Sequence, residues 1–558
     1  MESMSGSLLD TPRRFRPRDT NERGFSFYVA ACFTINYVIG TGFLALPWAF
    51  NEAGIVLSLI TLLLVAVASD MSKNMLLEAI AVADTLVKVR SAQGEPLLSG
   101  GRSIGSRVQE NISLLPVQST PSPASAAEDE EDDKFTSPHM MVGARHFEVT
   151  ELCELLLGRV GRNIYLLAAS IYLYGALWAY ASVFSNALAA HVKLDFISSD
   201  EDVNYILYLC VFAVAVVPLT CMEMEEQIMT QVTLAALRGV LIVLILSTIG
   251  IALYHDDGSS FEDSDGIQGT QLVRIGNIFK LAPIAIYANI YHHSIPNLAK
   301  TLRDRTRLVE LFSWVFVVVN LAYALIGVSI AVYFGNDTAT SANIHWVKYI
   351  GGNQGWSDFA SFFVVVFPAL DVLSASPLNG ITLGNNMCSA FTGERAEDVL
   401  GNSRTRLFWR LLAAVPPLIG AAFVRDLGVI TDYAGTSGFL VAFMFPALLY
   451  LAAMKCAKKE IMVTPIEHEP TVLRRASSEI SMETRTDDGE DSVGEEMSTC
   501  KGPVLYGVEA TMGRAEYVDT AHSTRIVNPT SALCVFAFGL VGVVAVLISL
   551  VLDSASVI

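Results

Sequence analysis

Long apolar runs recur along most of this chain, and polar stretches separate them. A helix needs roughly 17 to 25 residues to cross the ~30 Å hydrocarbon core of a bilayer, and about eleven runs reach that length. They lie at residues 25–50, 54–79, 163–191, 203–219, 228–253, 272–298, 309–334, 358–384, 407–424, 429–454 and 529–552. The pattern therefore predicts an all-α polytopic membrane protein with about eleven transmembrane helices.

The first run contains Gly40-Thr41-Gly42 near its centre. An unsatisfied peptide group in hydrocarbon costs several kcal/mol, so non-helical backbone is stable there only where it lines a cavity or meets a polar ligand. Small residues also permit close helix packing in membranes, which is the purely structural interpretation of the same motif. We interpret it as a break in the span, and take Val38, Ile39, Gly40, Thr41 and Gly42 as candidate substrate-binding residues.

The sixth run is also interrupted. Two prolines enclose Asn289, His292, His293 and Ser294 within its apolar frame. Paired interrupted helices at corresponding places in two halves are typical of inverted-repeat transporters. The ends of half-helices offer amides to an anion and carbonyls to a cation, and together these poles fit a zwitterion. Asn289 and His292 therefore join the candidate substrate site.

Aromatic side chains recur along the third run, at Tyr172, Tyr174, Trp178 and Tyr180. They could form a gate over a bound substrate, and Tyr174 is our candidate for contact with it. An aromatic stripe at helical spacing is equally typical of a packed core.

Two ionisable residues lie inside apolar runs, Arg238 in the fifth and Asp371 in the eighth. A charge at the bilayer centre costs upward of ~2.5 kcal/mol, so such residues indicate function. Ser374 follows Asp371 on the same helical face, and the three residues form a candidate ion-coupling site. In one arrangement Arg238 pairs with Asp371 and replaces a bound sodium ion. In a second arrangement Asp371 stands apart from Arg238 and carries a proton, and a third interpretation is a purely structural ion pair.

Composition agrees with a membrane protein, because 52% of the residues are hydrophobic and 17% are charged. The formal net charge of −19 at pH 7 reflects two long acidic loops rich in Ser, Pro and Gly, which we expect to be disordered. The predicted organisation is a tail at 1–24, spans 1–2 at 25–90, an acidic loop at 91–145, spans 3–10 at 163–454, an acidic loop at 456–527 and span 11 at 529–552.

Positive charge indicates the orientation of the chain in the membrane. Lys and Arg cluster before the first run and after the sixth, eighth and tenth runs. Because short cytoplasmic loops hold such an excess, we expect a cytosolic N-terminus. The candidate membranes are the plasma membrane and the endosomal or lysosomal membrane.

Short motifs outside the spans predict modification and sorting. Asn336 begins an Asn-x-Thr sequon in a predicted outer loop and is a candidate glycosylation site. Ser477 follows two arginines and is a candidate phosphorylation site. Glu110 with Leu114 and Leu115 has the spacing of an acidic dileucine sorting signal. A kinase and sorting adaptors are therefore candidate partners of the cytosolic loops.

Enzymatic chemistry has little support in the sequence. The eight cysteines show no metal-binding spacing, and we find no nucleophile elbow, phosphate loop or zinc motif. His292 and His293 are adjacent, so on a helix they point about 100° apart and do not easily share a metal ion. We expect neither an enzyme nor a cofactor, nor binding of nucleic acid.

Several strings resemble one transporter family. GTGFLALP at 40–47 is similar to the first-span signature of the amino acid/auxin permease family, within the amino acid-polyamine-organocation superfamily. Further strings are similar to the transmembrane protein 104 branch of that family: IYLYGALWAY at 171–180, HHSIPNLAKTL at 292–302, VPPLIGAAFVRDL at 415–427 and DYAGTSG at 432–438. The resemblance extends over nearly all the apolar runs and not over the two acidic loops.

The resemblance implies a leucine-transporter-type fold, in which spans one to five and six to ten form a 5+5 inverted repeat and one extra helix follows. It also implies amino acid transport coupled to protons or sodium, and it supplies no particular substrate. Where a sodium-coupled relative has neutral oxygens, this chain has Arg238 and Asp371, which favours proton coupling.

The expected function is therefore secondary active transport of amino acids or similar small zwitterions by alternating access across the lipid bilayer. Two alternatives remain open at this point. One is a sodium-coupled amino acid symporter, and the other is a non-transporting amino acid sensor or scaffold with the same fold.

Overall fold

The computed structural model describes residues 24–92, 142, 147–192, 200–221, 228–255, 259–262, 266–392, 403–458, 524 and 526–556. Its α-helices are α1 (Phe27–Val38), α2 (Gly42–Ala53), α3 (Ile55–Ala92), α5 (Val149–His191), α6 (Glu201–Thr220), α7 (Ile228–His255), α8 (Ile278–Asn289), α9 (Ile295–Thr301), α10 (Leu308–Phe334), α11 (Gln354–Thr392), α13 (Ser403–Phe423), α14 (Leu427–Phe439), α15 (Phe445–Cys456) and α17 (Pro529–Ser556). Within these ranges β-structure is limited to two isolated bridges. The prediction of an all-α polytopic membrane protein is confirmed.

Nine helices of the described residues are long and apolar enough to cross a membrane, or ten spans when α1 and α2 are counted together as one broken span. α8 and α9 are shorter, at 12 and 7 residues, and do not meet this criterion. The predicted number of eleven is reached only if α8 and α9 form a second broken span.

Both predicted interruptions exist. α1 ends at Val38 and α2 begins at Gly42, and the two helices are bent by 50°. α8 ends at Asn289, and a single 3₁₀ turn, η4 (His292–Ser294), leads into α9. Pro296 lies in the first turn of α9, where a missing amide hydrogen leaves no helical bond unmade.

A third irregularity lies in the tenth apolar run. One π-helical turn, η8 (Leu440–Met444), joins α14 to α15 without a break in direction large enough to divide the span. The turn packs against η4, so the irregular backbone of the tenth run supports the irregular backbone of the sixth.

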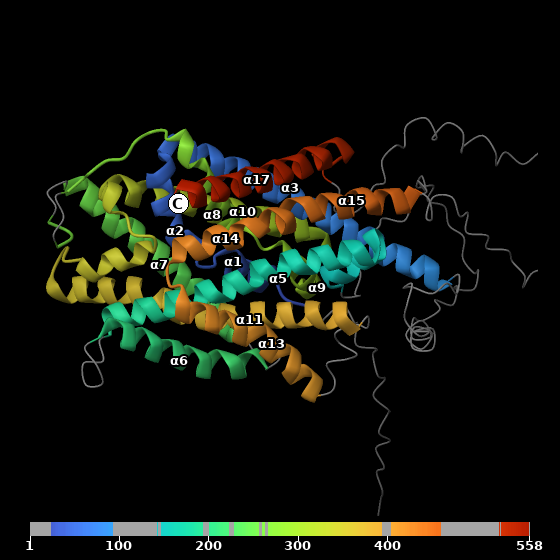
Figure 1. Cartoon of the computed structure of the whole chain (residues 1–558), viewed down its shortest axis with the longest axis horizontal. Coiled ribbons are helices and arrows are strands. Elements are labelled where there is room, and N and C mark those ends of the chain that lie inside the picture. The colour runs from blue at the N-terminus through green and yellow to red at the C-terminus, as the bar shows by residue number, and fades with distance from the viewer. Residues whose placement is uncertain are drawn as a thin grey trace, which may run out of the picture.

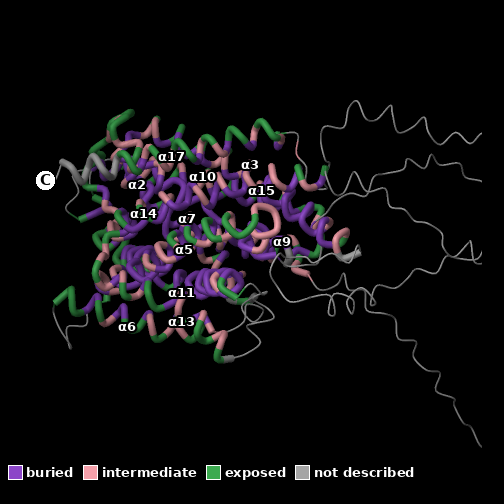
Figure 2. Tube along the Cα trace, turned by 45° about the vertical axis from the view of Figure 1, so that its right-hand side comes forward, coloured by how far each residue is buried: buried purple, intermediate pink, exposed green. Residues whose placement is uncertain are grey.

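Figure 1 shows the helices as one elongated bundle, with α1 and α8 in its middle, α6 and α13 along one edge and α3 and α17 along the other. Burial follows the same arrangement (Figure 2). The most apolar windows of α11 and α14–α15 are 71% and 72% buried, whereas those of α13 and α17 are 28% and 22% buried. The perimeter helices therefore present apolar side chains to the outside, as a protein surrounded by lipid requires.

The interrupted segments are packed between complete helices. α2 packs against α8 and α10, and α14 packs against α5 and α8. Glycine permits the closest of these approaches, because a Cβ added to Gly435 of α14 would lie directly against the Pro283 carbonyl oxygen of α8. The long helices thus fix the place where the sixth span breaks.

Substitution of Gly435 by Val tests this contact. The new side chain meets backbone, which cannot swing aside, so we expect α14 and α8 to separate at a cost of about 1–3 kcal/mol. Thermal unfolding of the purified protein in detergent should show a lower midpoint. Gly250→Val on α7 is the matched control, since no atom lies within 4 Å of its added carbon. Equal midpoints for the two variants would contradict the close packing.

Candidate functional site

The two interrupted spans meet at one hydroxyl group. The Tyr323 hydroxyl of α10 lies 3.2 Å from the Val38 carbonyl oxygen at the end of α1 and 3.1 Å from the Ala288 carbonyl oxygen near the end of α8. A phenol has one proton, so the two carbonyls share this donor, and the Val38 oxygen also accepts the Gly40 amide hydrogen at 3.0 Å. The carbonyl ends of both half-helices are therefore side by side.

The amide end of α2 lies at the same place. Thr41 is the N-cap residue of α2, yet its side chain makes no capping bond and instead lies 3.1 Å from the Tyr287 hydroxyl. The first amides of α2 therefore have no side-chain cap, and the positive end of the helix dipole is available to an anion.

Both glycines of the motif are required by close neighbours. A Cβ on Gly42 would lie 2.7 Å from the Ala288 Cα atom, and one on Gly40 would lie 3.2 Å from the Tyr180 hydroxyl. The structural interpretation of this motif therefore holds, because the small residues bring the two breaks together.

The break in the sixth span carries buried polar atoms without partners. Asn289 donates its side-chain amide to the Ala285 carbonyl oxygen at 2.9 Å, which leaves Oδ1 unused. Among the residues that the structure describes, five buried polar atoms of this segment have no hydrogen-bond partner: Asn289 Oδ1, Tyr291 Oη, His292 Nδ1, His293 Nδ1 and Ser294 Oγ. An unmade hydrogen bond of a buried group costs about 1–3 kcal/mol, so the break in the sixth span is polar and incompletely bonded.

The structure does not bring Tyr174 to the breaks. Its hydroxyl donates to the Leu412 carbonyl oxygen of α13 at 2.8 Å. Tyr172 lies there instead, with its hydroxyl 3.3 Å from the Ile290 carbonyl oxygen and its ring centroid 6.0 Å from that of Tyr287. Two positions along a helix rotate the side chain by about 200°, and sequence alone did not indicate which face of α5 points inward.

Arg238 and Asp371 form a buried ion pair. The Arg238 Nε and Nη2 atoms lie 2.7 and 2.6 Å from Asp371 Oδ2, and Nη1 donates to the Ile35 carbonyl oxygen of α1 at 3.2 Å. The alternative in which Asp371 stands apart from Arg238 is therefore wrong. Arg238 instead joins α7, α11 and the end of α1. α11 also carries Ser374, whose side chain lies outside the described part of the structure.

The remaining candidates lie elsewhere in the chain. Asn336 is exposed in the 3₁₀ turn η6 (Gly335–Asp337), away from the breaks. Ser477, Glu110, Leu114 and Leu115 lie outside the described residues.

A cavity of about 870 Å³ opens at the end of the bundle where α5 and α10 end and α6 begins. Its titratable lining residues are Glu201, Asp202, Tyr205, Glu262, Asp337, His345, Lys348, Arg425 and Asp426. One ion pair, Arg425 with Asp202 at 2.5 Å, joins the loop before α14 to the start of α6. The sequence analysis did not identify this cavity, since its lining comes from five separate stretches of the chain.

His345 is a half-buried titratable group of this cavity. Its ring stacks on Phe334 with centroids 3.8 Å apart, and its Nε2 atom accepts the Ala339 amide hydrogen at 2.9 Å. Burial lowers the pKa of His345 to about 4. The ring is therefore neutral at neutral pH, as its accepting Nε2 atom requires.

Comparison with known proteins identifies the class of protein to which this chain belongs. The family model described as "Transmembrane amino acid transporter protein" matches residues 23–93 and 138–468. The chain belongs to the transmembrane amino acid transporter family, as the sequence resemblance predicted. This is a family of membrane transporters and not of enzymes, so the chain is a multi-pass integral membrane protein of the transporter class.

Individual relatives agree with this family. The chain is 24% identical over 487 residues to the transmembrane protein 104 homolog of Dictyostelium discoideum, covering 80% of this chain and 92% of the relative. It is 22% identical over 461 residues to transmembrane protein 104 of Homo sapiens, covering 76% and 87%. The predicted similarity to the transmembrane protein 104 branch is confirmed.

Two solved structures are similar at a remote level. A nucleobase-cation-symport-1 family transporter in a closed conformation has 12% identity and a TM-score of 0.44, covering 80% of this chain and 81% of that chain. A Na⁺-coupled sialic acid symporter in an outward-open state has 11% identity and a TM-score of 0.42, covering 79% and 82%.

Substitution of Arg238 by Ala tests the buried ion pair. It leaves the Asp371 carboxylate buried without its counter-charge, which costs about 3–5 kcal/mol, so we expect a strongly lowered unfolding midpoint in detergent. The double variant Arg238→Met with Asp371→Leu removes both charges and should recover most of the loss. A single variant as stable as the wild type would show that the pair does not join these helices.

Substitution of His345 by Gln tests the imidazole in the cavity. The unfolded chain binds a proton at the ordinary histidine pKa of about 6.5, whereas the folded protein binds it only near pH 4. The unfolded state thus holds more protons in this window, and the stability of the wild type should fall as the pH decreases from about 6.5 to about 4. The variant should show a smaller difference between its unfolding midpoints at the two ends of this window. An unchanged difference would mean that His345 is not the group responsible.

Proposed function

We propose that this protein is a secondary active transporter that moves amino acids or similar small zwitterions by alternating access, coupled to protons. One observation carries the proposal. The uncapped amide end of α2 lies beside the shared carbonyl ends of α1 and α8, with Gly42 against Ala288. Opposite poles of backbone therefore face one small region inside an apolar bundle.

A zwitterionic substrate matches these poles. Its carboxylate would accept hydrogen bonds from the first amides of α2, and its ammonium group would donate to the carbonyl oxygens of Val38 and Ala288. The side chain of Asn289 adds an unused oxygen acceptor near the end of α8. The first break thus supplies donors and one acceptor and the second supplies acceptors, which favours a solute with both charges over an anion or a cation alone.

Alternating access is supported by what fills the region between the breaks. Tyr172, Tyr287 and Tyr323 are all buried there, with exposures of 5%, 6% and 1%. A substrate can reach the helix ends only if such side chains move. The half-helices provide the means, because an interrupted span can tilt each half separately about its break.

Proton coupling is supported by Arg238. Its guanidinium donates to the Ile35 carbonyl oxygen of α1 and to Asp371 of α11, and so occupies the place where a coupling cation would bridge these helices. A guanidinium remains charged throughout the physiological pH range, so it cannot leave the site as a transported sodium ion does.

Transport by purified protein in liposomes tests the proposal. We expect accumulation of a labelled amino acid when the outside is more acidic than the inside, and no accumulation with a sodium gradient alone. Gly42→Leu should abolish uptake, because its side chain would occupy the contact with Ala288 and block the α2 amides. Gly250→Leu is the matched control and should transport as the wild type does, since the space around its added carbon is open.

Each opposing result has a distinct meaning. Uptake that strictly requires sodium and is independent of pH would replace proton coupling by sodium symport. Binding of amino acids, measured by a thermal shift, without any accumulation would favour the non-transporting sensor.

A further inference from the structure

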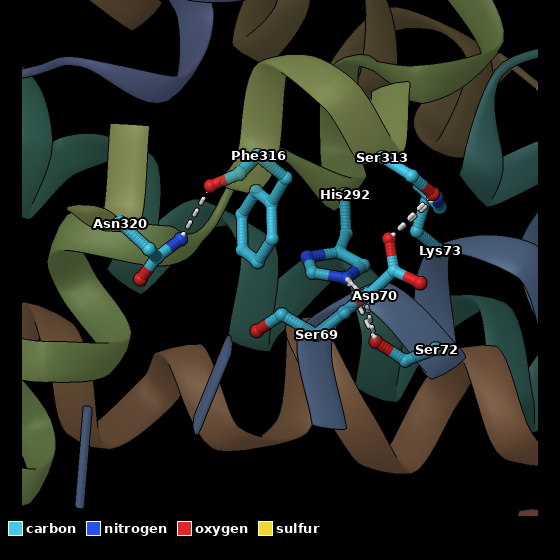
Figure 3. Close-up of polar contacts among 8 residues, drawn as sticks. All are labelled: Ser69, Asp70, Ser72, Lys73, His292, Ser313, Phe316 and Asn320. Atoms are coloured by element: carbon cyan, nitrogen blue, oxygen red, sulfur yellow. Dashed lines mark hydrogen bonds and ion pairs between the residues drawn. The ribbon is translucent and has the colours of Figure 1, made fainter. Parts of the chain in front are cut away.

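A second polar cluster lies next to η4, the 3₁₀ turn in the break of the sixth span (Figure 3). The Lys73 ammonium of α3 lies 2.7 Å from Asp70 Oδ1 and donates to Ser313 Oγ of α10 at 2.6 Å. Ser313 in turn donates to Asp70 Oδ1 at 2.8 Å. The Lys73 side chain is fully buried, whereas that of Asp70 is 34% exposed. α3 therefore holds a compensated ion pair inside the bundle and beside η4.

His292 joins this cluster through its Nε2 atom. This nitrogen lies 2.8 Å from Ser72 Oγ and 3.1 Å from the Ser69 carbonyl oxygen (Figure 3). A carbonyl oxygen only accepts, so the contact with Ser69 requires a hydrogen on Nε2. The Ser72 hydroxyl donates its own proton to the Ser69 carbonyl and is free to accept from the imidazole. One tautomer satisfies all three contacts.

This tautomer leaves a lone pair on Nδ1. The His292 side chain is buried, at 1% exposure, and among the described residues Nδ1 has no hydrogen-bond partner. Imidazole is the side chain whose ordinary pKa lies closest to neutral pH, so this buried lone pair can hold a proton when a nearby negative charge compensates the loss of solvation. The Nε2 bonds would be unaffected, because that nitrogen already carries its hydrogen.

The charges around His292 determine whether its Nδ1 atom can hold a proton. Asp70 and Lys73 face it from α3, and Tyr291 and His293 are its titratable neighbours along the chain. Two further elements pack against η4: the π turn η8 (Leu440–Met444), which has no titratable side chain, and α9, which carries Lys300. Asp70 and Lys73 cancel each other, so a proton on Nδ1 would add one uncompensated positive charge.

We propose that His292 is the proton-binding site that couples transport, and that Asp371 is not. Asp371 is occupied by Arg238, whereas His292 has an acceptor atom to spare. The step is a simple protonation: an N–H bond forms at Nδ1 with a proton from one aqueous compartment, and it breaks when the proton leaves to the other. This inference rests on the proposed transport function and deepens it.

The substrate carboxylate supplies the charge that the protonated ring lacks. Ala288, which contacts Gly42 at the start of α2, precedes His292 by four residues. An imidazolium at His292 and a carboxylate at the α2 amides therefore attract each other in a region of low dielectric. Each raises the affinity for the other, so proton and amino acid bind together and are released together.

The test compares two transport modes of the same liposomes, with the membrane potential clamped at zero. A gradient of one pH unit corresponds to about tenfold accumulation if one proton accompanies each zwitterion. We expect the wild type to approach this ratio. His292→Gln retains an amide N–H for Ser69 but has no titratable nitrogen, so its accumulation ratio should fall to about one. Counterflow, the exchange of labelled for unlabelled substrate, needs no net proton movement, so this variant should reduce counterflow much less than it reduces the accumulation ratio, whatever its effect on substrate affinity.

The neighbouring His293 provides the matched control. It is also buried in η4, and its Nε2 atom lies 3.4 Å from Asn379 Oδ1 rather than beside the Asp70 and Lys73 pair. His293→Gln should keep accumulation driven by the pH gradient. If His292→Gln still accumulates substrate, or if His293→Gln alone loses accumulation, His292 is not the coupling site although the protein remains a proton-driven transporter. If the wild type itself fails to accumulate substrate with a pH gradient, the proposed coupling fails as well.

Proton uptake in detergent gives an independent measurement. A pH-sensitive dye in weakly buffered solution should report about one proton taken up per amino acid bound by the wild type and none by His292→Gln. Equal uptake by both proteins would overturn the assignment.

Discussion

Every peptide group in a membrane interior needs a hydrogen-bond partner, and this requirement governs the structure around its two breaks. The Tyr323 hydroxyl lies between the end carbonyls of α1 and α8 and has one proton for both, and the Gly40 amide also donates to the Val38 carbonyl oxygen. The amide end of α2 has no side-chain cap at all. A bound solute can supply the hydrogen bonds that these helix ends still lack. The rest of the bundle holds the ends in place.

Complete helices provide that support. α3, α7, α10 and α14 pack against the interrupted segments, and small residues such as Gly42 and Gly435 let backbone approach backbone. The pair of Arg238 with Asp371 connects α1 to α7 and α11, and the pair of Lys73 with Asp70 connects α3 to α10. The first broken span is thus bound to α7 and α11 through a buried charge, and the sixth contacts α3 through the hydrogen bonds of His292.

The two charged clusters differ in what they can do. Arg238 and Asp371 satisfy each other and offer a fixed positive charge at the end of α1. The cluster at α3 reaches a histidine with an unused acceptor, in the turn that connects α8 to α9. A fixed charge can replace a coupling ion, and a group with an unused lone pair can bind one. The transporter family to which the chain belongs gives this division a functional context.

The amino acid sequence by itself determined the class of protein, the places of most spans and both breaks, because span length, glycine and proline are local properties of the chain. It also marked Arg238 and Asp371 as unusual, and the same signal was present but not used at Asp70 and Lys73. Only the tertiary structure decided that Arg238 meets Asp371, that Tyr172 rather than Tyr174 faces the breaks, and that His292 reaches α3. These contacts join residues 118 to 223 positions apart. They depend on how each helix is rotated and tilted in the bundle, which packing against its neighbours determines and local pattern does not.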